Sequence, residues 1–263
     1  MNIEIAIAPL IETLAIYIWP FVRIGAFLMV MPLIGSSFTP VRVRLILAIV
    51  LTIAIAPMVP ATATQEVLSA AGLVMMIQEI GIGVAMGFLV QLVFDAIALG
   101  GQVIGMSMGL GFAVFLDRAR GVSIPVLGQL FLMLAMLVFL SMDGHLAMIQ
   151  LLVKSFRTWP MSGDGLTLPI VSELLAWTGQ LFIFALKIAL PAITALLVVN
   201  LSFGIMSRAA PTLNLFAVGF PVAMLLGFTV IFLNMGVLIE NVSAFLTLSI
   251  SKVSHLLELH AQP

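Results

Sequence analysis

The sequence of 263 residues contains no cysteine and only three histidines. The absence of cysteine excludes disulfide bonds, thiol catalysis and cysteine metal sites. The histidines, at positions 145, 255 and 260, form no metal-binding cluster, and the chain lacks a phosphate-binding P-loop, an HExxH motif and a dinucleotide fingerprint. We therefore expect no metal ion and no cofactor, and we do not expect an enzyme.

Charged residues are also scarce, since they make up 8% of the chain, against roughly 25% in an ordinary soluble domain. The 10 basic and 11 acidic residues give a net charge of −1 at pH 7, so no basic face is available for nucleic acid. In contrast, 63% of the residues are hydrophobic and the mean hydropathy is +1.30. This composition predicts an integral membrane protein in contact with membrane lipid.

Charge-free stretches predict where the chain crosses the membrane. Five of them contain 20 to 31 residues, and an α-helix needs roughly 20 to cross about 30 Å of hydrocarbon. They occupy residues 45–65, 96–116, 121–142, 188–207 and 209–239. Residues 5–34 form a further apolar run, interrupted by Glu12, Pro20 and Arg23, and Glu4 before it argues against a cleavable signal. About six hydrophobic segments are expected.

Prolines in or beside these apolar runs predict irregular helices. A proline removes a backbone hydrogen bond, and in lipid the freed groups need partners within the protein. The sequence therefore predicts an all-α integral membrane protein built from broken helices and helical hairpins. The prolines concerned are Pro32, Pro40, Pro57, Pro60, Pro125, Pro191, Pro211 and Pro221.

One polar stretch, at residues 154–173, predicts a loop inside the chain. It contains two prolines, two glycines and Trp159, a residue type common at membrane interfaces. We therefore expect a boundary near residue 160, between a region of residues 1–160 and a region of residues 161–263.

The segment of residues 100–121 combines a glycine repeat with flexible and aromatic side chains. Gly101, Gly105 and Gly109 are four residues apart, which on a helix gives a smooth groove for close helix packing. The methionines and phenylalanines around and after this repeat are suited to a deformable seal over an opening. These residues are Met106, Met108, Phe112 and Phe115.

Five charged residues lie in or at the border of apolar runs: Arg23, Glu79, Asp95, Lys187 and Arg208. A charge at mid-membrane costs about 2.5 to 3.5 kcal/mol on insertion scales, so each should face protein or water. We expect ion pairing between helices, or side chains that reach the interface, rather than a proton relay. In a helix, the only plausible relay pair, Glu79 and Asp95, would be separated by about 24 Å.

A formal match to the nucleophile elbow of hydrolases occurs at residues 105–109, with Ser107 at its centre. The other members of a catalytic triad would be His145 and either Asp117 or Asp143. However, the motif requires a preceding strand and a turn into a helix, whereas here it lies in an apolar run. We do not favour a hydrolase.

Three blocks of sequence carry a resemblance to a known family. They span residues 21–57, residues 108–146, which begin MGLGFAVFLD, and residues 190–221, which include NLSFGIMSRAAPTLN. Together they resemble the FliR/SctT family of type III secretion export gates over nearly the whole chain. The most specific positions are Asn200, Arg208, Pro211, Asn214 and Pro221.

This resemblance implies a subunit of a protein-conducting gate that passes unfolded flagellar subunits. Residues 1–160 would be the FliP-like region and residues 161–263 a FliQ-like helical hairpin region. The implied partners are FliP-like and FliQ-like gate subunits, FlhB-like and FlhA-like components, and export substrates in transit. The implied location is the bacterial inner membrane at the flagellar basal body, with the gate projecting toward the periplasm.

The resemblance also implies a plug loop in the pore at about residues 106–121. A pore wide enough for an unfolded chain needs an apolar, displaceable seal, because hydrophobic constrictions close by dewetting. Arg118 stands where many relatives have proline, so this plug would carry extra charge. The implied plug residues are Met106, Met108, Phe112, Phe115, Leu116, Asp117, Arg118 and Arg120.

The alternative is a secondary transporter or channel for a small solute, since broken helices and internal charges are also expected there. Such transporters are commonly built from two structural repeats around a site at the middle of the membrane. The sequence shows no convincing internal repeat, and Glu79, Asp95 and Lys187 form no matched pattern between its halves.

Overall fold

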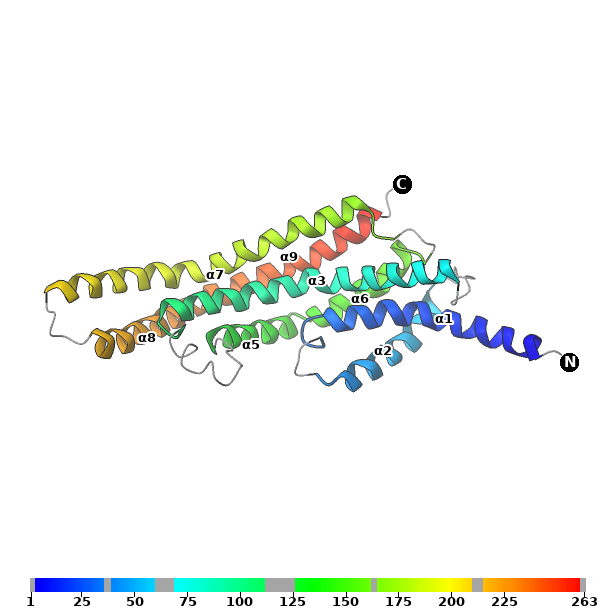
Figure 1. Ribbon diagram of the computed structural model, residues 1–263, viewed down its shortest axis with the longest axis horizontal. Coiled ribbons are helices and arrows are strands. Elements are labelled where there is room, and N and C mark those ends of the chain that lie inside the picture. The colour runs from blue at the N-terminus through cyan, green and yellow to red at the C-terminus, as the bar shows by residue number, and fades with distance from the viewer. Residues whose placement is uncertain are drawn as a thin grey trace. The chain divides into compact units, whose positions relative to one another are not determined.

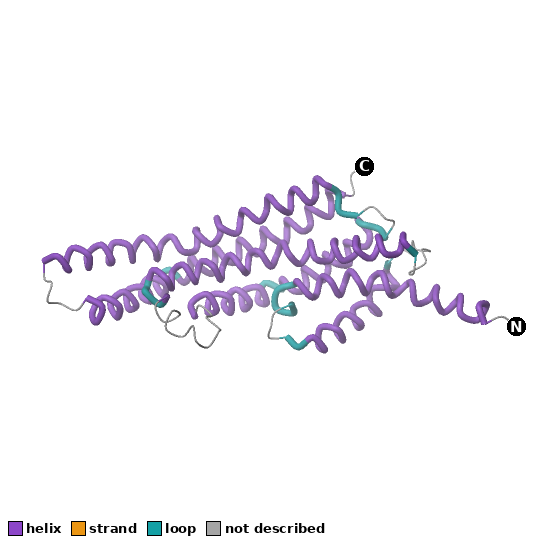
Figure 2. Tube along the Cα trace, viewed as in Figure 1, coloured by secondary structure: helices purple, strands orange, loops and turns teal. Residues whose placement is uncertain are grey.

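The computed structural model of the chain describes residues 3–35, 39–59, 69–111, 126–161, 165–209 and 215–260. Within these ranges every regular element is a helix (Figures 1 and 2). The helices are α1 (Ile3–Val30), α2 (Val41–Ile55), the short 3₁₀ helix η1 (Ala56–Met58), α3 (Ala70–Ser107), α5 (Val126–Ser141), α6 (Gly144–Thr158), α7 (Leu168–Ala209), α8 (Leu215–Leu233) and α9 (Met235–His260). The predicted all-α class is confirmed.

The chain divides into two compact units, each assembled from separate segments. Unit 1 comprises Met1–Leu92, Asp143–Thr178 and Thr247–Pro263, and unit 2 comprises Val93–Met142 and Gly179–Leu246. The long helices α3, α7 and α9 each contribute residues to both units. The boundary expected near residue 160 stays a prediction.

In unit 1, α1 and α2 pack against each other as a helical hairpin, and a turn follows the end of α1. At the start of this turn, the Gly35 amide donates a hydrogen bond to the Met31 carbonyl oxygen at 2.7 Å. A Cβ atom at Gly35 would lie 2.5 Å from the Met29 carbonyl oxygen, so the turn requires glycine at this position. Leu33 has φ of 74°, which is unusual for a residue with a bulky side chain.

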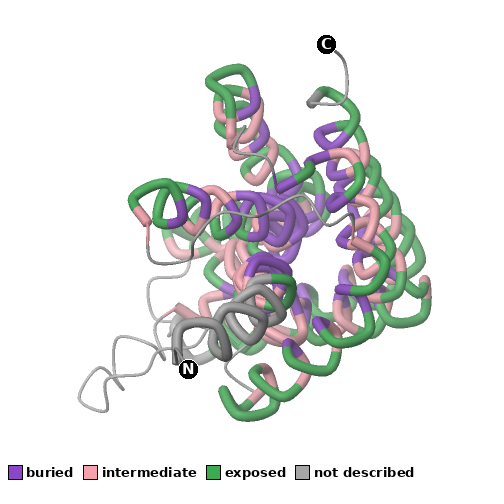
Figure 3. Tube along the Cα trace, turned by 90° about the vertical axis from the view of Figure 1, so that its right-hand side faces the viewer, coloured by how far each residue is buried: buried purple, intermediate pink, exposed green. Residues whose placement is uncertain are grey.

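The same unit packs α1 closely against α3. A Cβ atom at Gly83 would overlap the Arg23 carbonyl oxygen, and one at Gly87 would lie 3.1 Å from the Met31 amide nitrogen. Large side chains in the second half of α1 and directly after it are fully or almost fully buried, among them Trp19, Ile24, Phe27, Leu28 and Met31. Figure 3 shows that individual helices carry buried and exposed positions on different sides.

In unit 2, aromatic pairs join the helices. Phe94 of α3 and Phe139 of α5 meet edge to face with ring centroids 5.5 Å apart. Phe184 of α7 and Phe245 of α9 are stacked with centroids 4.2 Å apart. Such pairs contribute about 0.5–1.5 kcal/mol each beyond the area that they bury, so they help to fix α3 against α5 and α7 against α9.

Four of the described helical segments are long and apolar enough to cross a membrane. They are Val41–Met58, Ala70–Ser107, Leu168–Ala209 and Met235–Leu259, and α5 with α6 adds a fifth if the pair forms one broken span. Shorter apolar helices lie at Ile16–Val30 and Val218–Leu233. These lengths and compositions agree with an integral membrane protein, with fewer full spans than the six segments expected.

Two helices are much longer than a membrane span. α3 has 38 residues and α7 has 42, which at 1.5 Å per residue give lengths of about 57 and 63 Å. Pro191 and Pro221 lie inside α7 and α8, so neither of these two prolines ends a helix. Thr194 donates its hydroxyl hydrogen to the Leu190 carbonyl oxygen at 2.9 Å, whereas the carbonyl that loses its helical donor at Pro191 is that of Lys187.

Candidate functional site

The C-terminal part of α3 lies against α5 with the two backbones in contact. A Cβ atom at Gly101 would lie 2.8 Å from the Leu127 carbonyl oxygen, and one at Gly128 would lie 2.8 Å from the Ala98 carbonyl oxygen. At Gly105 the added Cβ would be 3.5 Å from the Leu127 Cβ, an ordinary contact. Larger residues at Gly101 and Gly128 would therefore force α3 and α5 apart.

The turn after α3 interrupts the glycine repeat. Gly109 is not helical, and its φ of 87° is a conformation that side-chain-bearing residues rarely adopt. Its amide donates to the Met106 carbonyl oxygen, and the Leu110 amide donates to the Gly105 carbonyl oxygen, both at 3.0 Å. Gly101 and Gly105 therefore face α5 from within the helix, whereas Gly109 allows the chain to leave the helix axis.

Side chains of α7 and α8 surround this turn. Met108 is fully buried, and a Cβ atom at Gly227 of α8 would lie 2.6 Å from the Met108 Cγ. On the same helix, the Phe220 ring approaches to 3.0 Å of the Cβ position at Gly109. The Asn200 side chain of α7 donates to the Ser107 carbonyl oxygen at 3.4 Å. We call this set of contacts the α3 end clamp.

The two methionines of the predicted plug have opposite environments. Met108 is 0% exposed inside the α3 end clamp, whereas Met106 is 54% exposed. The remaining expected plug residues, Phe112, Phe115, Leu116, Asp117, Arg118 and Arg120, lie outside the described residues. The description resumes at Val126, next to Leu127, which lies against Gly101 and Gly105. The described residues on either side of the expected plug thus belong to one end of the α3 and α5 pair.

The formal hydrolase motif has no strand before it, because residues 105–107 belong to α3. The Ser107 hydroxyl donates to the Val103 carbonyl oxygen at 3.0 Å, within its own helix. The strand, turn and helix that make a nucleophile elbow are therefore not formed here. In the part of the chain that the structure describes, no group of three or more metal-binding side chains occurs.

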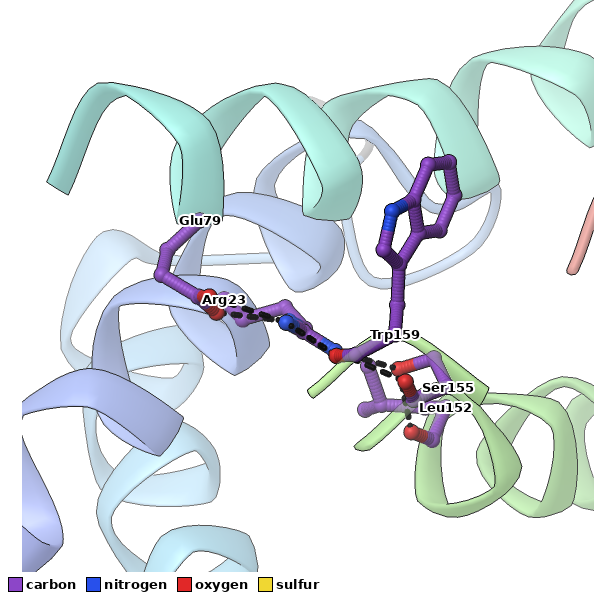
Figure 4. A network of polar contacts seen from close by, with 5 residues as sticks. All are labelled: Arg23, Glu79, Leu152, Ser155 and Trp159. Carbon is purple, nitrogen blue, oxygen red and sulfur yellow. Dashed lines mark hydrogen bonds and ion pairs between the residues drawn. The ribbon is translucent and has the colours of Figure 1, made fainter. Parts of the chain in front are cut away.

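A buried ion pair lies in unit 1 (Figure 4). The Arg23 Nε donates to Glu79 Oε2 at 2.6 Å, and Nη2 donates to Oε1 at 2.9 Å. The same guanidinium donates to the Ser155 carbonyl oxygen and to the Trp159 carbonyl oxygen, both at 3.0 Å. It also lies 4.5 Å from the centroid of the Phe156 ring. One arginine of α1 thus connects α3 with the end of α6.

The environment of this pair supports a structural role. Arg23 is 0% exposed and Glu79 is 2% exposed, and such burial is costly unless both charges are fully paired. Asp95, the other carboxylate considered for a relay, is exposed. A separation of 16 residues on α3 places it about 24 Å from Glu79 and about 160° around the helix. Glu79 and Asp95 therefore do not line a single path for a proton.

The other charged residues of the prediction are exposed. Lys187 lies on α7 with its ammonium 5.9 Å from the centroid of the Phe245 ring. Arg208 lies in the last turn of α7, where the helix dipole favours a positive charge. Among the five charged residues considered in the sequence analysis, the structure shows an ion pair between Arg23 and Glu79.

Several polar contacts in unit 1 could not be expected from the sequence. Ser155 accepts the Arg23 Nη1 hydrogen at 3.2 Å through its hydroxyl oxygen and donates to the Leu152 carbonyl oxygen at 2.7 Å. Trp159, expected at a membrane interface, is fully buried, and its backbone carbonyl accepts a hydrogen bond from Arg23. A serine and a tryptophan more than 130 positions from Arg23 carry no periodic signal that could have indicated this contact.

A second polar cluster ties the end of α9 to α6 and α7. Lys154 donates to Glu258 at 2.8 Å, and Lys252 forms an ion pair with Glu173. His255 lies 3.5 Å from the same Glu173 carboxylate. Lys252, His255 and Glu258, spaced three residues apart on α9, are the signal that could have suggested it.

The sequence of this chain matches a known protein family. A family model described as "Bacterial export proteins, family 1" matches residues 14–248. The chain belongs to the bacterial export proteins, family 1. In this family member, the matched range contains both the Arg23 network and the α3 end clamp.

Curated relatives of this export protein carry the name flagellar biosynthetic protein FliR. The protein from Escherichia coli (strain K12) is 41% identical over 81% of this chain and 82% of its own length. The one from Pectobacterium carotovorum is 39% identical over 92% of this chain and 90% of its own length. The one from Bacillus subtilis (strain 168) is 25% identical over 95% and 97%, respectively. The predicted resemblance to the FliR family is confirmed.

Proposed function

We propose that this chain is a subunit of the flagellar type III export gate in the bacterial inner membrane. With FliP-like and FliQ-like subunits it forms a protein-conducting pore that passes unfolded flagellar subunits. A plug loop at about residues 106–121 seals this pore at rest. Membership in the bacterial export proteins and the similarity to proteins named flagellar biosynthetic protein FliR support the proposal.

The α3 end clamp is the observation that carries the plug assignment. The chain leaves α3 at Gly109 with Met108 buried against Gly227 and with Asn200 holding the Ser107 carbonyl. The segment that follows therefore starts from a fixed point. A plug needs this combination, because a seal that must move aside and return requires an anchor that keeps its place.

The residue types in the proposed plug suit a seal against ions. Met106 and the phenylalanines at 112 and 115 are apolar, and methionine adapts its shape readily. An apolar constriction excludes water and so blocks ions without binding them. Substrates of many sequences must pass the same point, which favours a displaceable plug over a specific binding pocket.

Deletion of residues 112–120 tests the plug. We expect the assembled complex to retain its subunits while the membrane becomes permeable to ions, measured as single-channel conductance in planar bilayers. A control variant replaces the same residues by an equal number of alanine and leucine residues, which keeps length and apolarity and should keep most of the seal. Background conductance of an intact complex carrying the deletion would overturn the plug assignment.

Co-purification tests the partners. We expect this chain, extracted in mild detergent, to bring FliP-like and FliQ-like subunits in fixed ratios, and FlhB-like and FlhA-like components more weakly. The exposed apolar surfaces of α7 and α8, including Leu197, Val198 and Phe232, are suited to such contacts. A chain that purifies alone, and that transports a small solute in vesicles, would contradict the gate and favour a secondary transporter.

A further inference from the structure

A groove between α1 and α2 in unit 1 has mostly apolar walls. It has a volume of about 210 Å³ and is lined by Tyr17, Ile18, Phe21, Ile49, Thr52 and Ile53. The only hydroxyl on its α2 wall is that of Thr52, which donates to the Ala48 carbonyl oxygen at 2.6 Å. The groove therefore offers an occupant no polar atom from α2, and it is suited to a hydrocarbon chain.

A positive charge lies in line with this groove. Arg42 is seven residues before Ile49 and eleven before Ile53, and both separations are within about 20° of whole turns of an α-helix. The three residues thus share one face of α2. Arg42 is exposed, and its side chain makes no hydrogen bond or ion pair with any residue that the structure describes.

The distance along α2 matches one leaflet of a membrane. Arg42 and Ile53 are about 16 Å apart along the helix axis at 1.5 Å per residue, and half of a hydrocarbon core measures about 15 Å. α2 belongs to the membrane-spanning candidate Val41–Met58, so Arg42 lies near one end of that span. A lipid with its headgroup at Arg42 would extend its acyl chain to the far end of the groove.

From this geometry we propose that the α1 and α2 groove binds an anionic phospholipid. The Arg42 guanidinium binds the phosphate, and one acyl chain lies between Tyr17 and Phe21 of α1 and Ile49 and Ile53 of α2. Basic residues at the surface of a membrane attract anionic headgroups, and arginine matches phosphate geometry with two parallel hydrogen bonds. This inference concerns unit 1 and does not depend on the proposed plug.

Fluorescence quenching in vesicles tests the proposal. Because the chain has no cysteine, Ile53→Cys introduces a unique site in it for a bimane label. The labelled protein, assembled with its natural partners, is placed in phosphatidylcholine vesicles that contain a fixed fraction of brominated phosphatidylglycerol or brominated phosphatidylcholine. We expect about fivefold preferential quenching by the anionic lipid, the size of effect that one arginine near the surface produces.

The matched control is Val50→Cys. Val50 is 55% exposed and Ile53 is 59% exposed, both lie on α2, and Val50 does not line the groove. We expect equal quenching by the two lipids at Val50. Arg42→Gln should remove the preference at Ile53, and Arg42→Lys should keep most of it. If the label at Ile53 disturbs assembly, Tyr17→Cys reports from the opposite wall.

Three results would overturn the proposal. Equal quenching at Ile53 by both lipids would show a surface that contacts lipid without selection. If the label at Ile53 is still quenched preferentially by the anionic lipid in Arg42→Gln, Arg42 does not bind the headgroup. Quenching at Val50 without quenching at Ile53 would show that a protein segment, and not a lipid, occupies the groove.

Discussion

The Arg23 guanidinium and the Glu79 carboxylate form a two-bonded ion pair across 56 positions of sequence, with both residues almost completely buried. The three remaining donor contacts of Arg23 reach Ser155 and Trp159. A pair of this kind is weak evidence for net stability, but the loss of one member leaves an uncompensated buried charge. It therefore holds α1, α3 and the end of α6 in one arrangement.

Glu79→Gln should destabilise the protein strongly. The substituted amide would direct an N–H donor at an arginine N–H donor and leave the guanidinium charge unpaired, a change that costs about 3–5 kcal/mol in buried pairs. We expect a lower thermal midpoint of the purified complex and less chain in the membrane. The double variant Arg23→Gln with Glu79→Gln should lose less than the sum of the two single changes. If the two single variants lower the thermal midpoint by amounts that add up in the double variant, Arg23 and Glu79 are not energetically coupled.

Glu258→Gln provides a comparison in the same unit. Lys154 and Glu258 lie 2.8 Å apart, but their side chains are 40% and 58% exposed, and exposed pairs contribute roughly 0–1 kcal/mol. We expect almost no change in the thermal midpoint, and any change should vanish at high salt. A loss as large as that of Glu79→Gln would mean that partner subunits bury this pair.

Charged residues inside helices explain why the charge-free stretches misplaced helices. Those stretches ended at charged residues, yet α3 runs from Ala70 to Ser107 through Glu79 and Asp95. A carboxylate that is paired inside protein does not end a helix, and hydropathy cannot distinguish it from one that does. α7 likewise continues past Lys187, whereas the stretch at residues 188–207 contains only its second half.

Local chemistry was more predictable than long-range contacts. The all-α membrane class followed from composition, and close packing at Gly101 was expected from its spacing to Gly105. The turn at Gly109 was not expected, because a four-residue spacing does not indicate where a helix ends. The positions of Gly227 and Asn200 next to this turn depend on tertiary structure, and no spacing in the sequence connects them with Met108.

Gly227→Leu should loosen the α3 end clamp. Even a Cβ at this position would lie 2.6 Å from the Met108 Cγ, and overpacking of this kind costs typically about 1–3 kcal/mol. If the clamp anchors the proposed plug, displacement of Met108 should raise the ion conductance of the assembled complex in planar bilayers. Met108→Ala combined with Gly227→Leu restores much of the volume and should recover part of the seal.

Gly204→Leu is the matched control for this experiment. Gly204 belongs to α7 of the same unit, and a Cβ there would have nothing within 4 Å. It should leave the conductance unchanged. A leak in Gly204→Leu, or a seal in Gly227→Leu as tight as in the unchanged protein, would contradict a specific role of the clamp.

A disulfide between α3 and α5 would test which part of the gate moves. The Cβ position at Gly105 lies 3.5 Å from the Leu127 Cβ, within the range of about 3.5–4.5 Å found in disulfides. Because the chain has no cysteine of its own, the double variant Gly105→Cys with Leu127→Cys should form this bond on mild oxidation. Faster migration on a non-reducing gel would report it, with the two single variants as controls.

We expect protein export to continue with the disulfide closed. Gly105 precedes the turn at Gly109, so a plug that moves beyond this turn leaves the packed part of α3 and α5 in place. If export stops on oxidation and returns on reduction, the helices themselves must separate during export. If no disulfide forms in the assembled complex, the two helices do not meet at Gly105 in the working protein.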